Sequence, residues 1–206
     1  AEAARMLSAA GHDVEVFAAG QQACSGPGEE GALVHRVVVA DRRDFPMALL
    51  PVFSARHAHA AFDVVETPEV GAEGLEVAEA YPDLPLVVKL HTPTYLISSL
   101  TYEPPSMAAQ LRFTLGALRR GGWARLRSPV YDIALDPEAR LARRADVVAA
   151  PSNAIASRVG SDWLLKSAQL QVFPLPYRLP ETLTGLPVPA TIKTIGFLRS
   201  EERRVG

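Results

Sequence analysis

Pro85 to Tyr95 reads PLVVKLHTPTY, and this stretch decides how the rest of the chain is interpreted. Leu86, Val87, Val88 and Leu90 form a short apolar run, which predicts a strand buried on both faces of a parallel sheet. In open α/β sheets, ligands bind outside the carboxyl ends of the strands. We therefore expect a ligand site after this strand, although a histidine that merely caps the strand is the alternative. The side chains at this end are His91, Thr92, Thr94 and Tyr95.

Apolar runs alternate with segments of helical spacing along the whole chain. This alternation predicts an α/β fold with a doubly wound, Rossmann-like parallel sheet. Segments 20–31 and 41–51 are expected to be irregular, because glycine, glutamine and proline interrupt the periodic pattern there. The expected strands are 13–18, 33–40, 62–67, 86–90, 145–150 and 170–173, and the expected helices are 1–10, 54–61, 74–81, 107–118, 137–144 and 152–165.

The composition excludes several classes of protein. The 206 residues carry a net charge of −2, from 21 basic and 23 acidic residues, so we expect no nucleic-acid partner. Cys24 is the single cysteine, which excludes an intrachain disulfide and a cysteine-rich metal site. No apolar run approaches the ~18 residues that span a bilayer, and no signal peptide opens the chain. These features favour a cytoplasmic protein.

The two ends of the chain predict a domain that extends beyond it. A helix, a turn at Gly11 and a strand open the chain, and right-handed crossover order places another strand before such a helix. We therefore expect the native domain to begin earlier. Residues 177–190 are proline-rich, as linkers are, and 191–198 read as a strand that opens a second domain. The expected first domain is thus 1–176.

A second group of polar residues lies at the end of the preceding strand, in the segment FDVVETPEVGAEG. Glu66 and Glu69 flank the strand end, and Gly71 with Gly74 allows a ligand to approach the backbone closely. The amides that start the next helix suit an anion, although Glu73 would oppose one. The alternative is that Glu69 and Glu73 only stabilise the helix N-terminus through its dipole.

A basic turn, RRGGWARLR, occupies Arg119 to Arg127 and contains Trp123. Such a turn suits acidic lipid headgroups or an anionic substrate. A solvated basic face is the simpler alternative.

Five segments, taken in order, resemble the amino-terminal domain of a family 4 glycosyltransferase of the two-Rossmann-domain type. Together they cover most of residues 1–198, and their order and spacing carry the match. The segments are LSAAGHDVEVF (7–17), FDVVETPEVGAEG (62–74), VKLHTP (88–93), RADVVAAPSNAIAS (144–157) and VFPLPY (172–177).

The resemblance implies that this domain holds the acceptor, while a carboxyl-terminal domain binds a nucleotide-sugar donor through a pair of glutamates. His91 matches the active-site histidine of the cleft. The implied reaction is retaining and needs no metal cofactor. The family's glycine-rich loop and donor-binding glutamates have no counterpart here, so we expect this chain alone to be inactive. The residues expected to bind the acceptor are Glu66, Glu69, Gly71, Thr92, Thr94 and Tyr95.

Several alternatives stay open. The acceptor is a small molecule, a glycan or a lipid, and a lipid acceptor would bring a peripheral contact at the inner membrane surface. The tail RSEERRVG, 199–206, resembles either a degenerate family loop or a translated cloning adapter. A non-catalytic α/β domain that binds a small ligand is the alternative function. A hydrolase is disfavoured because no G-x-S-x-G motif occurs.

Overall fold

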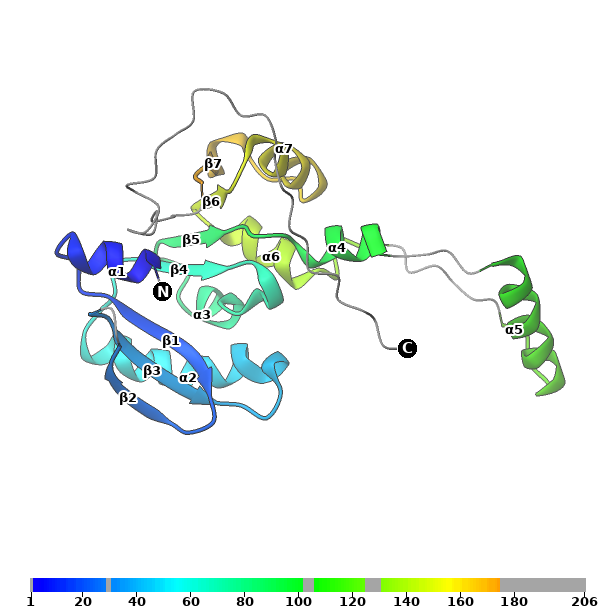
Figure 1. Cartoon of the computed structure of the whole chain (residues 1–206), viewed down its shortest axis with the longest axis horizontal. Coiled ribbons are helices and arrows are strands. Elements are labelled where there is room, and N and C mark those ends of the chain that lie inside the picture. The colour runs from blue at the N-terminus through cyan, green and yellow to red at the C-terminus, as the bar shows by residue number, and fades with distance from the viewer. Residues whose placement is uncertain (1, 29–30, 102–105, 125–130, 175–206) are drawn as a thin grey trace, which may run out of the picture. The chain divides into compact units, whose positions relative to one another are not determined.

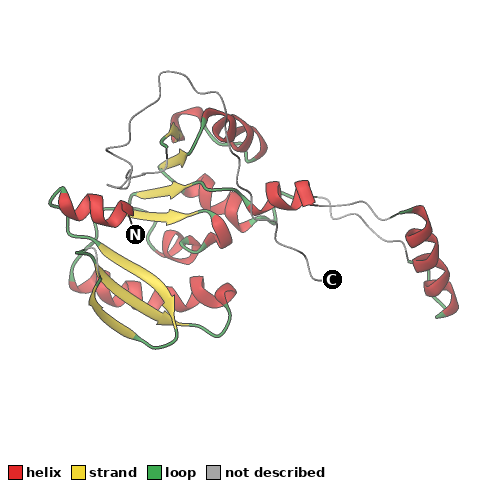
Figure 2. Cartoon of the chain, viewed as in Figure 1, coloured by secondary structure: helices red, strands yellow, loops and turns green. Residues whose placement is uncertain are grey.

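The computed structural model describes residues 2–28, 31–101, 106–124 and 131–174. Within these ranges, strands and helices alternate as the sequence predicts (Figures 1 and 2). The predicted linker at 177–190, the strand at 191–198 and the tail at 199–206 lie outside the described residues.

Four parallel strands form the larger sheet, in the order β4-β5-β6-β7. Its helices α3 (Leu75–Ala80), α6 (Pro137–Arg144) and α7 (Asn153–Asp162) join successive parallel strands, as crossover connections require. The carboxyl ends of all four strands therefore meet at one edge (Figure 1). This confirms the predicted doubly wound α/β fold. The strands are β4 (Val65–Pro68), β5 (Leu86–Lys89), β6 (Val147–Ala150) and β7 (Leu170–Val172).

A smaller sheet of three strands precedes it, in the order β1-β3-β2. After α1 (Glu2–Ala9), Gly11 adopts a φ of +90° in the predicted turn and the chain enters β1 (Glu15–Gly20). β1 pairs in parallel with β3 (Leu33–Val38). Within the described residues β1 and β4 each pair on one side only, and the strand expected before α1 stays a prediction.

The loop predicted at 20–31 is wrong in part, because β2 (Cys24–Pro27) pairs antiparallel with β3. Its sequence, CSGP, lacks the apolar residues that mark a strand. Backbone hydrogen bonds from any residue type are enough to form an edge strand, and Pro27 is tolerated there.

The irregular segment predicted at 41–51 is also wrong. η1 (Arg42–Asp44) is followed by α2 (Phe45–His59), which contains both Pro46 and Pro51. Pro46 lies in the first turn, where no amide donor is needed, but Pro51 lies inside the helix. α2 persists because it buries Phe45, Leu49 and Phe53 on one face.

The other helices agree more closely with the sequence. α5 (Met107–Arg119) and α6 form as predicted, and Ser152 caps α7 by accepting a hydrogen bond of 3.3 Å from the Ile155 amide. α7 ends at Asp162, before the predicted Leu165. α4 (Thr94–Thr101) was not predicted, and η2 (Val70–Ala72) and η3 (Ser167–Gln169) are short.

Two apolar clusters fix the strand ends. The larger lies between the four-stranded sheet and α3, α6 and α7, and its Val88, Leu90 and Trp163 have no exposed surface. The smaller packs α2 against β3 and α3 through Phe53, Val37 and Val77. Because such interiors pack densely, the backbone at the carboxyl edge is held rigidly.

Candidate functional site

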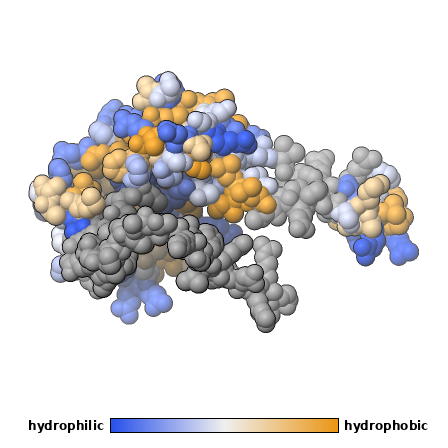
Figure 3. All heavy atoms as spheres, turned by 45° about the horizontal axis from the view of Figure 1, so that its top comes forward, coloured by the Kyte–Doolittle hydropathy of each residue, from blue (hydrophilic) through white to orange (hydrophobic). Residues whose placement is uncertain are grey.

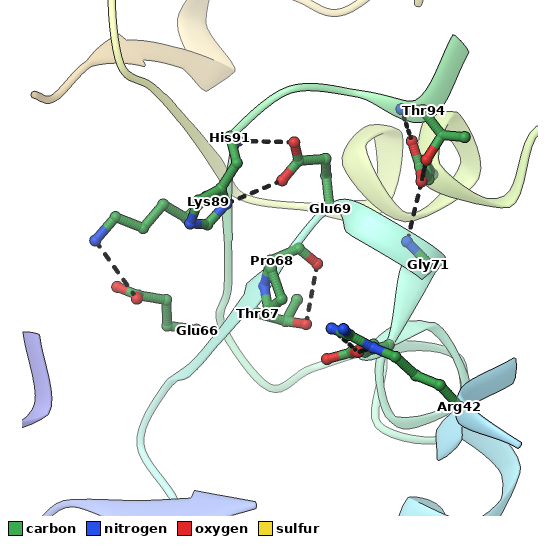
Figure 4. Close-up of polar contacts among 11 residues, drawn as sticks. Arg42, Glu66, Thr67, Pro68, Glu69, Gly71, Lys89, His91 and Thr94 are labelled. Carbon is green, nitrogen blue, oxygen red and sulfur yellow. Dashed lines mark hydrogen bonds and ion pairs between the residues drawn. The ribbon is translucent and has the colours of Figure 1, made fainter. Parts of the chain in front are cut away.

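The carboxyl ends of β4 and β5 bring together two residues that are 22 positions apart. The register pairs Pro68 with Lys89, and the Glu69 amide donates a hydrogen bond of 3.3 Å to the Lys89 carbonyl. Glu69 and His91 therefore leave neighbouring strands side by side (Figure 4). This juxtaposition follows from the parallel pairing of β4 with β5.

His91 is held in place by Glu69. The His91 amide donates to Glu69 Oε1 at 2.7 Å, and His91 Nδ1 lies 3.3 Å from Oε2 (Figure 4). The Glu69 side chain is fully buried, whereas 48% of the His91 side chain is exposed. A carboxylate accepts hydrogen bonds, so Nδ1 acts as the donor, and the other ring nitrogen, Nε2, takes no part in this contact.

An ion pair between buried Lys89 and exposed Glu66 lies beside His91. Lys89 Nζ is 3.8 Å from Glu66 Oε1 and 5.9 Å from the centre of the Phe173 ring. The Lys89 side chain is 10% exposed and that of Glu66 is 48% exposed. The sequence prediction omitted Lys89, although a lysine inside an apolar strand is itself a signal, because a buried charge needs a partner. Glu66, which is expected from the sequence to bind the acceptor, is exposed.

A buried glutamate on α6 joins the two loops of the site. Glu138 accepts hydrogen bonds from the Gly71 amide at 3.0 Å, from the Thr94 amide at 2.8 Å and from Thr94 Oγ1 at 2.6 Å. Sequence reasoning missed this residue because it lies 67 and 44 positions from its partners. It reads as an ordinary acidic residue in the first turn of a helix.

Gly71 is needed for its backbone conformation. Its φ of +71° lies in the left-handed region, and its amide is taken by Glu138. Gly74 is needed for packing, since a Cβ there would come within 2.8 Å of the Thr67 side chain. In this structure, therefore, Gly71 supports the site loop and its amide does not face a ligand.

The predicted acceptor residues after β5 divide into two groups. Thr92 is exposed, whereas the hydroxyl of Thr94 is used by Glu138. Tyr95 donates a hydrogen bond of 2.8 Å to Asp162 and stacks on Tyr131, with ring centres 4.5 Å apart. Burial and the Asp162 carboxylate raise the pKa of Tyr95 above its usual value, so its phenol stays protonated. Tyr95 thus anchors α4 to α7.

A hollow of about 320 Å³, open to solvent, lies at the carboxyl end of β1. Arg42 crosses to Glu73 at its rim, with Arg42 Nη2 2.8 Å from Glu73 Oε1 (Figure 4). A smaller hollow of about 50 Å³ lies at the opposite edge, beside Tyr81 and Asp146. Only the larger hollow lies at strand carboxyl ends, where such folds bind ligands. It is lined by Phe17, Ala18, Ala19, Val39, Arg42, Phe45 and Glu73.

The described residues contain no group of three His, Cys, Asp or Glu side chains arranged to hold a metal ion. Nor is any of their helices long and apolar enough to cross a membrane.

The chain was also compared with known proteins. It matches the family described as Glycosyltransferase Family 4 over residues 1–178, which is most of its length. No curated protein matches it.

Proposed function

The chain belongs to glycosyltransferase family 4, and from this premise we propose that it forms the acceptor side of an enzyme that moves a sugar from a nucleotide-sugar donor to an acceptor. The family supports glycosyl transfer as the class of reaction. The donor, the retaining course of the reaction and independence from metal are part of our proposal.

The main observation that supports this proposal is that Glu69 holds His91 in place. A buried carboxylate that holds both the backbone amide and one ring nitrogen fixes the direction of the imidazole. Pre-orientation of this kind lowers the entropic cost of placing a catalytic group against its substrate. Nε2 is then available to bond a hydroxyl of the donor sugar or of the acceptor.

The ion pair beside His91 supplies the proposed contact to the acceptor. Glu66 accepts hydrogen bonds from sugar hydroxyls, and bonds to a charged acceptor are stronger than neutral ones. Lys89 orients Glu66 from inside the sheet. Thr92 is exposed next to His91 and lines the same edge.

Four residues of the predicted set are hydrogen-bonded within the protein and take a different role. Both carboxylate oxygens of Glu69 contact His91, so we assign Glu69 as a positioning residue. Gly71, Thr94 and Tyr95 likewise act through Glu138 and Asp162, by fixing the loops that carry the exposed groups.

The test is turnover of nucleotide-sugar donors by the protein expressed from its complete reading frame. His91→Ala should lower kcat by at least about 100-fold, the size of effect typical of a positioned acid–base group. His59→Ala, on the exposed end of α2, is the matched control and should leave kcat unchanged.

Equal turnover by His91→Ala and wild type would remove His91 from the mechanism. Acceptor binding by the wild type without any turnover would instead favour a non-catalytic ligand-binding domain.

A further inference from the structure

α5 presents an apolar stripe to solvent. Met107, Leu111, Leu115 and Leu118 recur at helical spacing, and their side chains are 91%, 63%, 50% and 49% exposed. A helix of a globular protein normally buries such a stripe. Figure 3 shows apolar residues, in orange, on the surface of α5 beside hydrophilic ones in blue.

Basic residues border this stripe. Arg112 and Arg119 each follow a stripe leucine, and successive helix residues lie about 100° apart, so both arginines flank the apolar face. From Met107 to Arg127 the sequence contains five arginines and no acidic residue, in a chain whose net charge is −2. Arg112 Nε contacts the Ala108 carbonyl of its own helix, and no ion pair of the described residues involves α5.

An exposed tryptophan completes the pattern. Trp123 follows the end of α5 and is 69% exposed, whereas the other tryptophan, Trp163, is fully buried. Indole rings prefer the boundary between water and hydrocarbon, because one edge is polar and the body is apolar.

We propose that α5 binds a membrane surface that carries anionic headgroups. The leucine stripe enters the boundary of the acyl chains, and the arginines bond the headgroup phosphates. A solvated helix would explain the arginines but not the exposed stripe. Self-association of α5 would bring arginines of the two copies together, which like charge opposes. The proposal does not depend on the transferase activity.

The first test is cosedimentation of the full chain with vesicles. Vesicles of phosphatidylcholine mixed with phosphatidylglycerol should bind it, and vesicles of phosphatidylcholine alone should bind it weakly. Added salt should reduce binding, because it screens the arginines from the headgroups.

Substitutions within α5 test the arginines and the apolar stripe separately. Neutralising Arg112, Arg119 and Arg120 to Gln should lower the vesicle partition coefficient on the order of a hundredfold, at about fivefold for each arginine. Neutralising Arg36, Arg43 and Arg140, exposed elsewhere, makes the same change in net charge and should have little effect. Leu111→Ser with Leu115→Ser should also weaken binding, whereas Met47→Ser, exposed on α2, should not.

Tryptophan fluorescence gives an independent measurement. Anionic vesicles should shift the emission of Trp123 to the blue, and Trp123→Phe should remove this shift. Three results would overturn the proposal: equal binding to both kinds of vesicle, full binding by the α5 variants, or a self-associated wild type that the leucine variants convert to monomer.

Discussion

At the scale of single residues, two buried carboxylates organise the candidate site. Glu69 holds His91, and Glu138 holds the loops that carry Gly71 and Thr94. A buried carboxylate is tolerated only when its oxygens receive hydrogen bonds, and here backbone amides provide several of them. The hydrogen bonds that stabilise the buried carboxylates also fix the geometry of the loops.

Glu138→Ala should destabilise the fold by about 1–3 kcal/mol, because it removes the hydrogen bonds of the Gly71 amide and of both donors of Thr94. Urea unfolding followed by circular dichroism measures this loss. Glu79→Ala, which removes an exposed ion pair with Arg140, should cost less than about 1 kcal/mol. Similar losses for both variants would show that Glu138 does not hold the loops.

A partly buried carboxylate, Glu15, supports the smaller sheet. It lies 2.7 Å from His35 Nε2 and accepts two hydrogen bonds from Arg56, while Ser25 Oγ lies 2.8 Å from His35 Nδ1. Burial alone would raise the pKa of Glu15, but the hydrogen bonds from Arg56 and His35 outweigh it and lower the pKa below the usual value. This cluster ties β1 to β3 and α2.

The lowered pKa of Glu15 predicts a pH dependence of stability. A carboxyl group with a lowered folded pKa stabilises the fold above its unfolded pKa, about 4.3, and this contribution is lost as pH falls through the folded pKa. Glu15→Gln should therefore reduce the free energy of unfolding by about 1–3 kcal/mol at pH 7. The difference from wild type should shrink below about pH 4.3. Urea unfolding at a series of pH values tests this, and a constant difference would contradict it.

At the scale of secondary-structure elements, the sequence predicts best where one local pattern suffices. β5, α6 and the cap at Ser152 follow from an apolar run, a helical period and a side-chain oxygen in the right place. The helix predicted at 54–61 is the second part of α2, but β2 and the first part of α2 were missed because their local signals are weak or contrary. Pairing with β3 stabilises the first, and burial against the small apolar cluster stabilises the second.

Pro51 is a residue within α2 that disfavours a helix, and substitution measures its cost to stability. A proline inside a helix removes one hydrogen bond and crowds the preceding turn, at a cost of about 3 kcal/mol. Pro51→Ala should therefore stabilise the protein by about 1–3 kcal/mol, read as a higher thermal midpoint. Pro46→Ala, in the first turn, should change the midpoint little. A lower midpoint for Pro51→Ala would mean that its ring is needed for packing.

At the scale of the whole molecule, parallel pairing and the two apolar clusters place the site. Val65 packs against both clusters, so the small sheet with α2 and the larger sheet share one continuous interior through β4 and α3. The carboxyl edge that carries His91 is therefore supported from both sides. α5 differs from α2, α3, α6 and α7, which bury apolar side chains in the two clusters, since its apolar stripe stays exposed.

The sequence by itself determined the fold class, most strands and the edge at which His91, Glu66 and Thr92 lie, because strand and helix periods are local and parallel strands align their carboxyl ends. It also suggested the family. Only the tertiary structure decided which polar side chains face solvent and which hold the frame. Glu69, Thr94 and Tyr95 turned out to bond other residues of the protein, and Glu138 emerged as a support for two loops. Those assignments depend on contacts between residues far apart in the chain, which local patterns do not encode.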